Sequence, residues 1–261
     1  MTLPSNHLQV APDQQPIFRE VGLDAQAIFE DPRIVAWRKL PDRENCTLDA
    51  RLGDGRAIRW HIKRYSAAHG HQTPADADVA GHKLLEDRQI PTASLVGWGR
   101  ISDGRSFVIF EDLTGYVPAD KLIESGVPFN SILEPTANLA ARLHQVGLHH
   151  RDLYLCHFMA KVDSTGTDLK LIDTARVRPL PGFLTRRRWI IKDLAQFWYS
   201  TLKLPISDAQ RDAWLQRYAG QRGLPTGATL RPSIIRKSNQ IAHHDAALNR
   251  KQPTRNVSIP R

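Results

Sequence analysis

A short run near the middle of the chain could carry proton-transfer chemistry. Residues 150–153 read His-Arg-Asp-Leu, and a further histidine, His157, lies five residues after Asp152. A second carboxylate, Asp173, ends an apolar strand-like segment 21 residues after Asp152. A loop carboxylate can accept the proton of a hydroxyl group, and a carboxylate at a strand end can bind a metal ion. Together they predict metal-assisted chemistry on a hydroxyl acceptor.

The order of these residues is typical of the catalytic loop of protein kinases. That loop has the pattern H-R-D-L-x-x-x-N, in which the Asp accepts the substrate's proton and the Asn holds a metal ion. Asp152 is therefore the predicted catalytic base, Asp173 the predicted Mg²⁺ ligand, and His157 stands at the Asn position. Imidazole is a poor ligand for Mg²⁺, which prefers oxygen. His157 either contacts a metal ion or phosphate or donates a hydrogen bond to phosphate or to Asp152.

The elements around this run predict an α+β, bilobal fold of the protein-kinase type. Residues 1–30 are expected to be loosely structured. Residues 31–113 form the predicted N-lobe, which is mostly β with one helix and covers the nucleotide. Residues 114–261 form a helical C-lobe with the catalytic and substrate-binding residues and a basic tail. The alternation of apolar and polar residues over 57–65, after the D-G turn at 53–56, predicts a half-buried strand.

Lys63 lies on that strand and is predicted to pair with the α- and β-phosphates of ATP. A carboxylate on the following helix, predicted over 76–88, would hold this lysine. Counting back from the end of the helix suggests Asp78, with Glu86 as the alternative. Asp78 is one methylene shorter than the glutamate usual in this role.

The strand pair 34–52 is expected to cover the nucleotide, but its connection, 41–46, lacks the G-x-G-x-x-G pattern of protein kinases. Grip of phosphate by glycine amides is therefore weakened or absent. Glu111 and Leu113 follow the apolar strand 106–110 and lie where the adenine-contacting linker is expected.

Three further residues are predicted to support the catalytic loop rather than to react. His150 and Arg151 belong to the loop itself, and Asp193 matches a buried helix carboxylate that braces it. The histidines near Asp152 also suggest a metal-dependent hydrolase, but that alternative explains neither Lys63 nor the strand that ends at Asp173.

The run Leu143–Phe158 resembles the signature H-x-x-G-x-x-H-R-D-x-Y-x-C-H-F of the lipopolysaccharide core heptose kinase and Kdo kinase family. Histidine in place of asparagine and the lack of a glycine-rich loop both belong to that family's pattern. The departures are Asp78, where the family has glutamate, and the sequence at 173–176. Weaker correspondences lie at 62–64, 89–92, 107–113, 171–173 and 188–195.

This resemblance implies ATP-dependent phosphorylation of a heptose or Kdo hydroxyl on the inner core of lipopolysaccharide, at the cytoplasmic face of the inner membrane. Two alternatives remain open. A kinase of the same fold could act on another small molecule or a protein, or the chain could be a pseudokinase that serves as a binding module. The missing glycines and Asp78 favour the pseudokinase, whereas Lys63, Asp152 and Asp173 argue against it.

The charge of the chain indicates anionic partners. Its 261 residues carry a net charge of +9, with a pI near 9.8. Residues 186–188 and Lys192 are predicted to hold a phosphorylated saccharide or an anionic lipid surface, with an ordinary solvated surface as the alternative. No nucleic-acid partner is expected, because zinc-finger spacing and an aromatic RNA-binding signature are both missing from the sequence.

A cytoplasmic protein is expected from the remaining features. No apolar run reaches the length needed to cross a bilayer, and residues 1–15 show no signal-peptide pattern. The two cysteines, Cys46 and Cys156, are too few for a disulfide framework or a structural zinc site.

Overall fold

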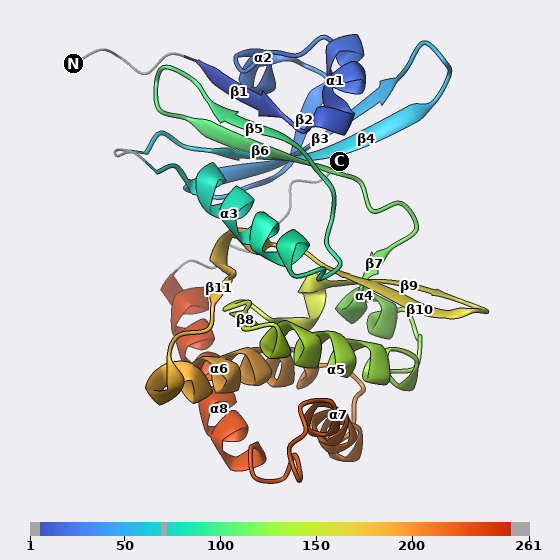
Figure 1. Cartoon of the computed structure of the whole chain (residues 1–261), viewed down its shortest axis with the longest axis vertical. Coiled ribbons are helices and arrows are strands. Elements are labelled where there is room, and N and C mark those ends of the chain that lie inside the picture. Colours follow the sequence, from blue (N-terminus) through green and yellow to red (C-terminus); the bar gives the residue numbers. More distant parts are fainter. Residues whose placement is uncertain (1–5, 69–71, 252–261) are drawn as a thin grey trace. The chain divides into compact units, whose positions relative to one another are not determined.

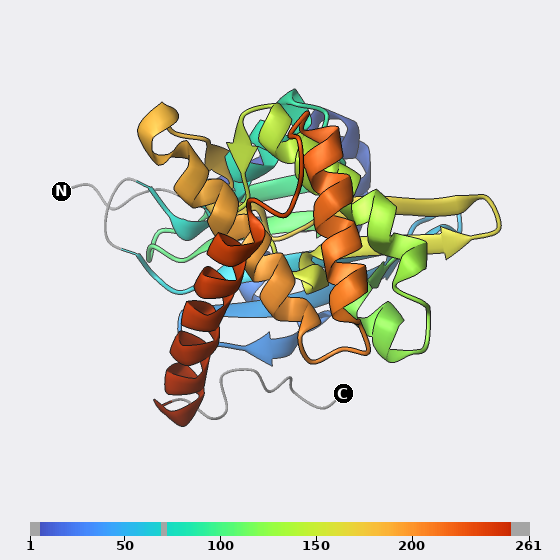
Figure 2. The same cartoon turned by 90° about the horizontal axis from the view of Figure 1, so that it is seen from below.

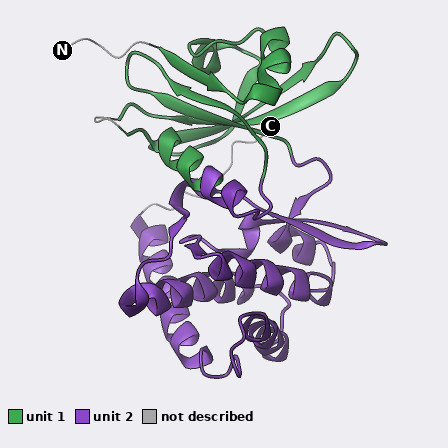
Figure 3. Cartoon of the chain, in the orientation of Figure 1, with its two compact units in different colours: residues 1–82, 93–112, 253–261 green, residues 83–92, 113–252 purple. Residues whose placement is uncertain are grey.

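The computed structural model describes residues 6–68 and 72–251, which form two compact units (Figure 3). Among the described residues, unit 1 contains 6–82 and 93–112, and unit 2 contains 83–92 and 113–251. Each unit has a hydrophobic core of its own. Unit 1 is dominated by a β-sheet and unit 2 by helices, so the predicted α+β class is confirmed.

Unit 1 is built on a six-stranded antiparallel sheet with the strand order β1-β5-β6-β4-β3-β2 (Figure 1). A tight turn with Gly55 in the left-handed region (φ 87°) joins β3 to β4, as the D-G pattern predicts. The strands are β1 (His7–Val10), β2 (Ile34–Lys39), β3 (Arg43–Arg51), β4 (Ala57–Tyr65), β5 (Leu95–Arg100) and β6 (Ser106–Glu111).

The N-terminal segment differs from the prediction. Residues 1–30 were expected to be loosely structured, but their described part forms β1, a 3₁₀ turn (Pro12–Gln14), α1 (Gln15–Val21) and α2 (Ala27–Glu30). Phe18 stacks on Trp60 with ring centroids 5.5 Å apart, and Ile28 is fully buried. Helices α1 and α2, which carry these side chains, lie over one face of the sheet (Figure 1), and burial of the side chains in the core there explains why the segment is ordered.

Strand β4 faces two different layers because successive side chains of a strand point to opposite faces. Trp60 and Ile62 belong to the core beneath α1 and α2. Tyr65 belongs to a smaller cluster with Ala75 and Val79 of helix α3 (Pro74–Asp87). The charged residue Lys63 lies two positions before Tyr65, on the α3 side of the sheet.

The start of α3 is specified by its sequence. Thr73 Oγ1 accepts a hydrogen bond from the backbone N–H of Asp76 (3.2 Å), and the Asp76 carboxylate accepts one from the Thr73 N–H (2.7 Å). This reciprocal cap, with Pro74 at the first helical position, places the helix start. The helix begins in unit 1 and ends in unit 2, so residues 83–92 depart from the predicted N-lobe, 31–113.

Unit 2 is a helical assembly with two small antiparallel sheets, ordered β10-β9-β7 and β11-β8. Its helices are α4 (Ala119–Glu124), α5 (Asn130–Gln145), α6 (Phe183–Thr201), α7 (Asp208–Gln221) and α8 (Arg231–Lys251), and its strands are β7 (Val117–Pro118), β8 (Leu148–His149), β9 (Phe158–Asp163), β10 (Gly166–Leu171) and β11 (Arg178–Pro179).

Aromatic side chains join three of these helices. Trp214 of α7 stacks on Phe197 of α6 with ring centroids 3.9 Å apart, and on Tyr218 at 6.0 Å. Its indole N–H donates to Thr136 Oγ1 of α5 (2.9 Å), so the buried polar atom is satisfied. This core fixes α6, the helix that supports the catalytic loop.

Helix α8 lies in the part of the chain expected to be a basic tail. Figures 1 and 2 both show it alongside α6, against which it packs. Ile234 and Ser238 are buried, and Ile241 is partly buried against the same core. Their spacing of four and three residues forms one helical face. The predicted tail beyond residue 251 lies outside the described residues.

No helix within residues 6–68 and 72–251 is long and apolar enough to cross a membrane.

Candidate active site

Helix α6 carries the side chains that hold the catalytic loop of unit 2. Asp193, Gln196 and Ser200 are spaced by three and four residues and therefore share one face of the helix. Gln196 accepts a hydrogen bond from the Leu153 N–H (3.2 Å), and Ser200 Oγ accepts one from the Leu155 N–H (2.9 Å). The loop backbone is thus bound at successive points along one helix.

Asp193 makes the most concentrated set of these contacts. Its fully buried carboxylate accepts hydrogen bonds from the backbone N–H groups of His150 (2.7 Å) and Arg151 (2.8 Å). His144 Nε2 donates a third (3.2 Å), and His144 Nδ1 is hydrogen-bonded to the hydroxyl of Tyr218 (2.7 Å). Burial raises the pKa of Asp193, but the hydrogen bond and charge of His144 outweigh it, so the pKa lies below its ordinary value.

Arg151 takes a backbone conformation that these contacts must support. Its φ is 66°, in the left-handed region, which costs a residue with a side chain about 1–3 kcal/mol. The N–H of Arg151 is held by Asp193 and its carbonyl accepts from Gln196 Nε2 (3.0 Å). The guanidinium lies 4.7 Å from the ring centroid of Trp189, another α6 residue. The backbone is strained at Arg151, and hydrogen bonds to both its N–H and its carbonyl hold it in this conformation.

A hairpin brings Asp173 beside His157. Strands β9 and β10 pair with Leu171 opposite Phe158, and the Ile172 N–H donates to the carbonyl of His157 (3.0 Å). His150 Nε2 donates to the carbonyl of Ile172 (3.1 Å). Burial lowers the pKa of His150, and the nearby charge of His157 lowers it further. A neutral His150 thus ties the catalytic loop to the strand end that carries Asp173.

Asp152, His157 and Asp173 form one cluster, with a ligand atom of each within 4.8 Å of the others. Asp152 Oδ1 accepts a hydrogen bond from Gln196 Nε2 (3.3 Å) and forms an ion pair with Arg176 Nη1 (3.7 Å). All three cluster side chains are partly exposed, at 17–21%. Oriented carboxylates that are open to solvent can receive a substrate proton and a divalent ion.

His157 has a defined orientation within the cluster. Its Nδ1–H donates to the backbone carbonyl of Asp152 (2.7 Å), which leaves Nε2 facing Asp173 Oδ2 at 3.6 Å. Burial lowers its pKa, but Cys156, the Asp173 carboxylate and the carbonyl of Asp152 together raise the pKa to about 9. A protonated imidazole donates hydrogen bonds, and it ligates a metal ion only after losing that proton.

The donor set of this cluster fits a divalent cation. Two carboxylates supply the oxygen ligands that Mg²⁺ prefers, with Asp173 as the predicted ligand and Asp152 close to it. Asp173 is held in the left-handed region, with φ 63° and ψ 65°. Such a conformation in a residue with a side chain is concentrated at functional sites.

Unit 1 contains the lysine–carboxylate pair. Lys63 Nζ lies 3.0 Å from Asp78 Oδ1, and the Asp78 side chain is fully buried. The hydroxyl of Tyr65, two residues along β4, donates to the other oxygen of the same carboxylate. Burial raises the pKa of Tyr65, so its hydroxyl stays protonated and remains a donor. Asp78, the first of the two predicted carboxylates, is thus in contact with Lys63.

The predicted adenine-contacting residues lie where the chain passes from unit 1 to unit 2. Glu111 is the last residue of β6 in unit 1, and its carboxylate accepts a hydrogen bond from Gln14 (2.8 Å). Leu113 belongs to unit 2, and its carbonyl accepts from the Tyr116 N–H (2.9 Å). Their part in nucleotide binding stays a prediction.

Four residues with polar contacts at the site were not identified from the sequence: Tyr65, Arg176, Gln196 and Ser200. The signal for Gln196 and Ser200 is their helical spacing from Asp193, and for Tyr65 its two-residue spacing from Lys63 on an alternating strand. Arg176 carries no such pattern.

The model of the lipopolysaccharide kinase (Kdo/WaaP) family matches residues 60–218 of this chain. That span is more than half of the chain and includes Lys63, Asp78 and the whole cluster around Asp152.

Similar proteins carry a common name, lipopolysaccharide core heptose(I) kinase WaaP. The one from Escherichia coli K12 is 25% identical over 221 residues, which are 74% of this chain and 80% of that protein. The one from Pseudomonas aeruginosa is 30% identical over 151 residues, 52% of this chain and 56% of that protein. A solved structure, the pseudokinase domain of the immune regulator BIR2, covers 88% of this chain and 85% of its own at 14% identity and a TM-score of 0.46.

Replacement of Asp193 by Asn is expected to lower the free energy of unfolding by about 3 kcal/mol at neutral pH, because a buried, hydrogen-bonded carboxylate is lost. Its pKa is lower in the folded protein than in the unfolded chain. The charge therefore stabilises the fold above the unfolded pKa, and this contribution disappears as the pH falls through the folded one.

Urea denaturation of both proteins between pH 7 and pH 3 measures this effect. The difference between wild type and Asp193→Asn should shrink toward the acid end. A difference that stays constant or grows on acidification would contradict the role of the carboxylate.

Replacement of Asp78 by Ala is expected to weaken nucleotide binding by about tenfold or more, since Lys63 loses a charged hydrogen-bond partner. Asp87→Ala, at an exposed carboxylate on the same helix, should bind nucleotide as wild type does. Fluorescence titration with a labelled ATP analogue gives both dissociation constants. Equal losses in the two variants would show that Asp78 has no special role.

Proposed function

Because the chain belongs to the lipopolysaccharide kinase (Kdo/WaaP) family, we propose that it transfers the γ-phosphate of ATP to a heptose hydroxyl on the inner core of lipopolysaccharide. Family membership makes it a kinase. Three relatives named as heptose(I) kinases favour heptose over Kdo as the acceptor sugar. The cluster of Asp152, His157 and Asp173 is the observation that supports this activity most directly.

Asp152 is the residue that would take the proton of the acceptor hydroxyl. Gln196 and Arg176 both contact its Oδ1, which leaves Oδ2 as the oxygen for the substrate. The backbone contacts from Asp193 to the loop keep this carboxylate in position before the substrate arrives. Positioning of this kind is the main contribution of the protein to phosphoryl transfer.

Asp173 and His157 would hold a divalent metal ion, for which Mg²⁺ is the natural choice given the carboxylate oxygens. Such an ion neutralises phosphate charge when it is bound. With its proton retained, His157 would instead donate from Nε2 to a phosphate oxygen. In unit 1, Lys63 would pair with the α- and β-phosphates, oriented by Asp78.

The departure of Asp78 from the family's glutamate does not weaken this proposal. The shorter carboxylate still reaches Lys63 at 3.0 Å, and Tyr65 engages its second oxygen. The pseudokinase alternative rested partly on the shorter Asp78, and the contact of Asp78 with Lys63 removes that argument. An acceptor outside lipopolysaccharide is not favoured by the family or by the relatives.

We place the activity at the cytoplasmic face of the inner membrane, where a lipid-linked acceptor would be presented. Two consecutive apolar residues at the start of α6, Phe183 and Leu184, are 92% and 95% exposed. They directly precede the basic run 186–188. Exposed apolar side chains beside cations suit the surface of an anionic bilayer.

Replacement of Asp152 by Ala tests the proposed function. Transfer of labelled phosphate from ATP to dephosphorylated core saccharide should fall by about 10²–10⁴-fold, because the base is lost. Nucleotide binding and the unfolding transition should remain those of wild type. Near-wild-type turnover in this variant would refute the assignment, and wild-type activity on peptide but not on saccharide would move the acceptor to another class.

The membrane location is tested by sedimentation with phosphatidylglycerol vesicles. The double variant Phe183→Ser, Leu184→Ser should bind these vesicles more weakly than wild type, because two apolar side chains no longer enter the interface. A matched change at another exposed apolar residue, Leu202→Ser, should leave binding unchanged. Equal binding by all three proteins would contradict a bilayer role for the start of α6.

A further inference from the structure

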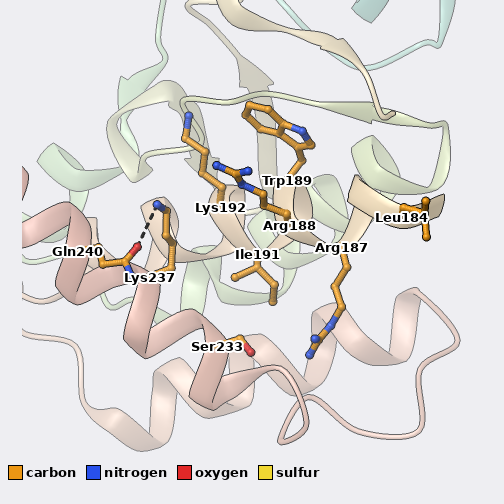
Figure 4. A pocket seen from close by; sticks show the side chains of 9 residues that line it. All are labelled: Leu184, Arg187, Arg188, Trp189, Ile191, Lys192, Ser233, Lys237 and Gln240. Carbon is orange, nitrogen blue, oxygen red and sulfur yellow. Dashed lines mark hydrogen bonds between the residues drawn. The ribbon is translucent and has the colours of Figure 1, made fainter. Parts of the chain in front are cut away.

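Unit 2 contains a pocket of about 650 Å³ between α6 and α8 (Figure 4). Its polar lining comes from both helices, and most of it is cationic. The polar residues that line it are Arg187, Arg188 and Lys192 of α6 and Ser233, Lys237 and Gln240 of α8.

The charge of the pocket is not balanced from within. No Asp or Glu lines it, and within the described part of the chain none of its four cations forms an ion pair. Lys237 Nζ donates only to the neutral amide of Gln240 (3.2 Å). Figure 4 shows Arg188, Lys192 and Lys237 with their charged ends toward one end of the pocket, whereas Arg187 extends toward the other. An anion at the first end would have three cations for partners.

Lys192 is a half-buried cation of this pocket. Burial lowers its pKa, and the charge of Arg151 lowers it further. When an anion binds beside a half-buried lysine that lies close to other cations, the free energy of the charged lysine falls.

The pocket adjoins the catalytic loop through α6. Trp189, which also lines the pocket, carries the Arg151 guanidinium 4.7 Å and the Lys192 ammonium 5.4 Å from its ring centroid. Asp193, which follows Lys192 on α6, accepts hydrogen bonds from the backbone N–H groups of His150 and Arg151 in the loop. A molecule anchored here would therefore lie next to the loop that carries Asp152.

We propose that this pocket is an acceptor subsite, which binds a phosphate or carboxylate group carried by the acceptor saccharide away from the hydroxyl that is phosphorylated. This role rests on the proposed function and adds a determinant of acceptor recognition to it. The concave shape suits a single anionic group, and the side chains of Ser233 and Gln240 offer hydrogen bonds to neighbouring sugar hydroxyls. The same anionic chemistry is found in phospholipid head groups, so the experiment separates the two sources.

Binding of glucose 6-phosphate, with glucose as the uncharged comparison, is the direct test by ligand-observed NMR. Wild type should bind the phosphate ester and not glucose. The double variant Arg188→Gln, Lys237→Gln should bind it at least about tenfold more weakly. Arg236→Gln removes an exposed cation adjacent to Lys237 but outside the pocket, and should bind as wild type does.

Vesicles form the second arm of the test. Sedimentation with phosphatidylglycerol vesicles should give the same binding for Lys237→Gln, a pocket residue outside the basic run 186–188, as for the wild type. Loss of vesicle binding with unchanged glucose 6-phosphate binding would overturn the proposal in favour of a lipid head-group site. Equal loss of sugar phosphate binding in Arg236→Gln would overturn it in favour of a diffuse positive surface.

Turnover distinguishes a failure of the subsite from a failure of the proposed function. With core saccharide as acceptor, Lys237→Gln should raise the acceptor KM at least about tenfold and leave kcat and the nucleotide KM unchanged. An unchanged acceptor KM would reject the subsite while the kinase assignment stands. Absence of transfer by wild type itself would reject the assigned acceptor, whereas the NMR result does not depend on turnover.

Discussion

The buried carboxylate of Asp193 is the interaction on which the active-site half of unit 2 depends. It gathers two backbone N–H groups of the catalytic loop and the imidazole of His144 at one point in the core. Without that acceptor, the left-handed conformation of Arg151 would lose the hydrogen bond to its N–H that helps to offset its strain. The direction of the Asp152 side chain follows from this backbone. The position of the reacting group is therefore set by a residue that does not itself react.

The residues of the Asp152 cluster could be brought together from sequence because they belong to short, continuous patterns. Asp152 and His157 lie in one loop, and Asp173 follows a strand whose register with β9 brings it beside that loop. Gln196 could not be found in this way, since its contact with Asp152 joins residues 44 positions apart and depends on how α6 packs. Tyr65 was missed for the same reason. Its contact with Asp78 depends on how α3 packs against β4.

The N-terminal segment and α8 are polar in composition, but their few apolar residues are well placed. In the N-terminal segment, Phe18 and Ile28 bury themselves on the sheet although most of their neighbours are polar. In α8, Ile234 and Ile241 pack against the core of unit 2 in the same way, within the stretch expected to be a basic tail. Average composition predicted a loosely structured segment over residues 1–30, whereas the spacing of a small number of apolar side chains decided the outcome.

Helix α6 has a different role on each of two faces. Its buried face holds the catalytic loop through Asp193 and Gln196, and its exposed face supplies Arg188 and Lys192 to the pocket. Helix α8 supplies Ser233, Lys237 and Gln240 to the same pocket. Substitutions on α6 therefore affect both the loop and the pocket, whereas these positions of α8 differ from Ile234 and Ser238, whose burial constrains them. Among descendants of one ancestral enzyme, a change in the preferred acceptor would be expected to accumulate on α8 while the phosphoryl-transfer machinery stays intact.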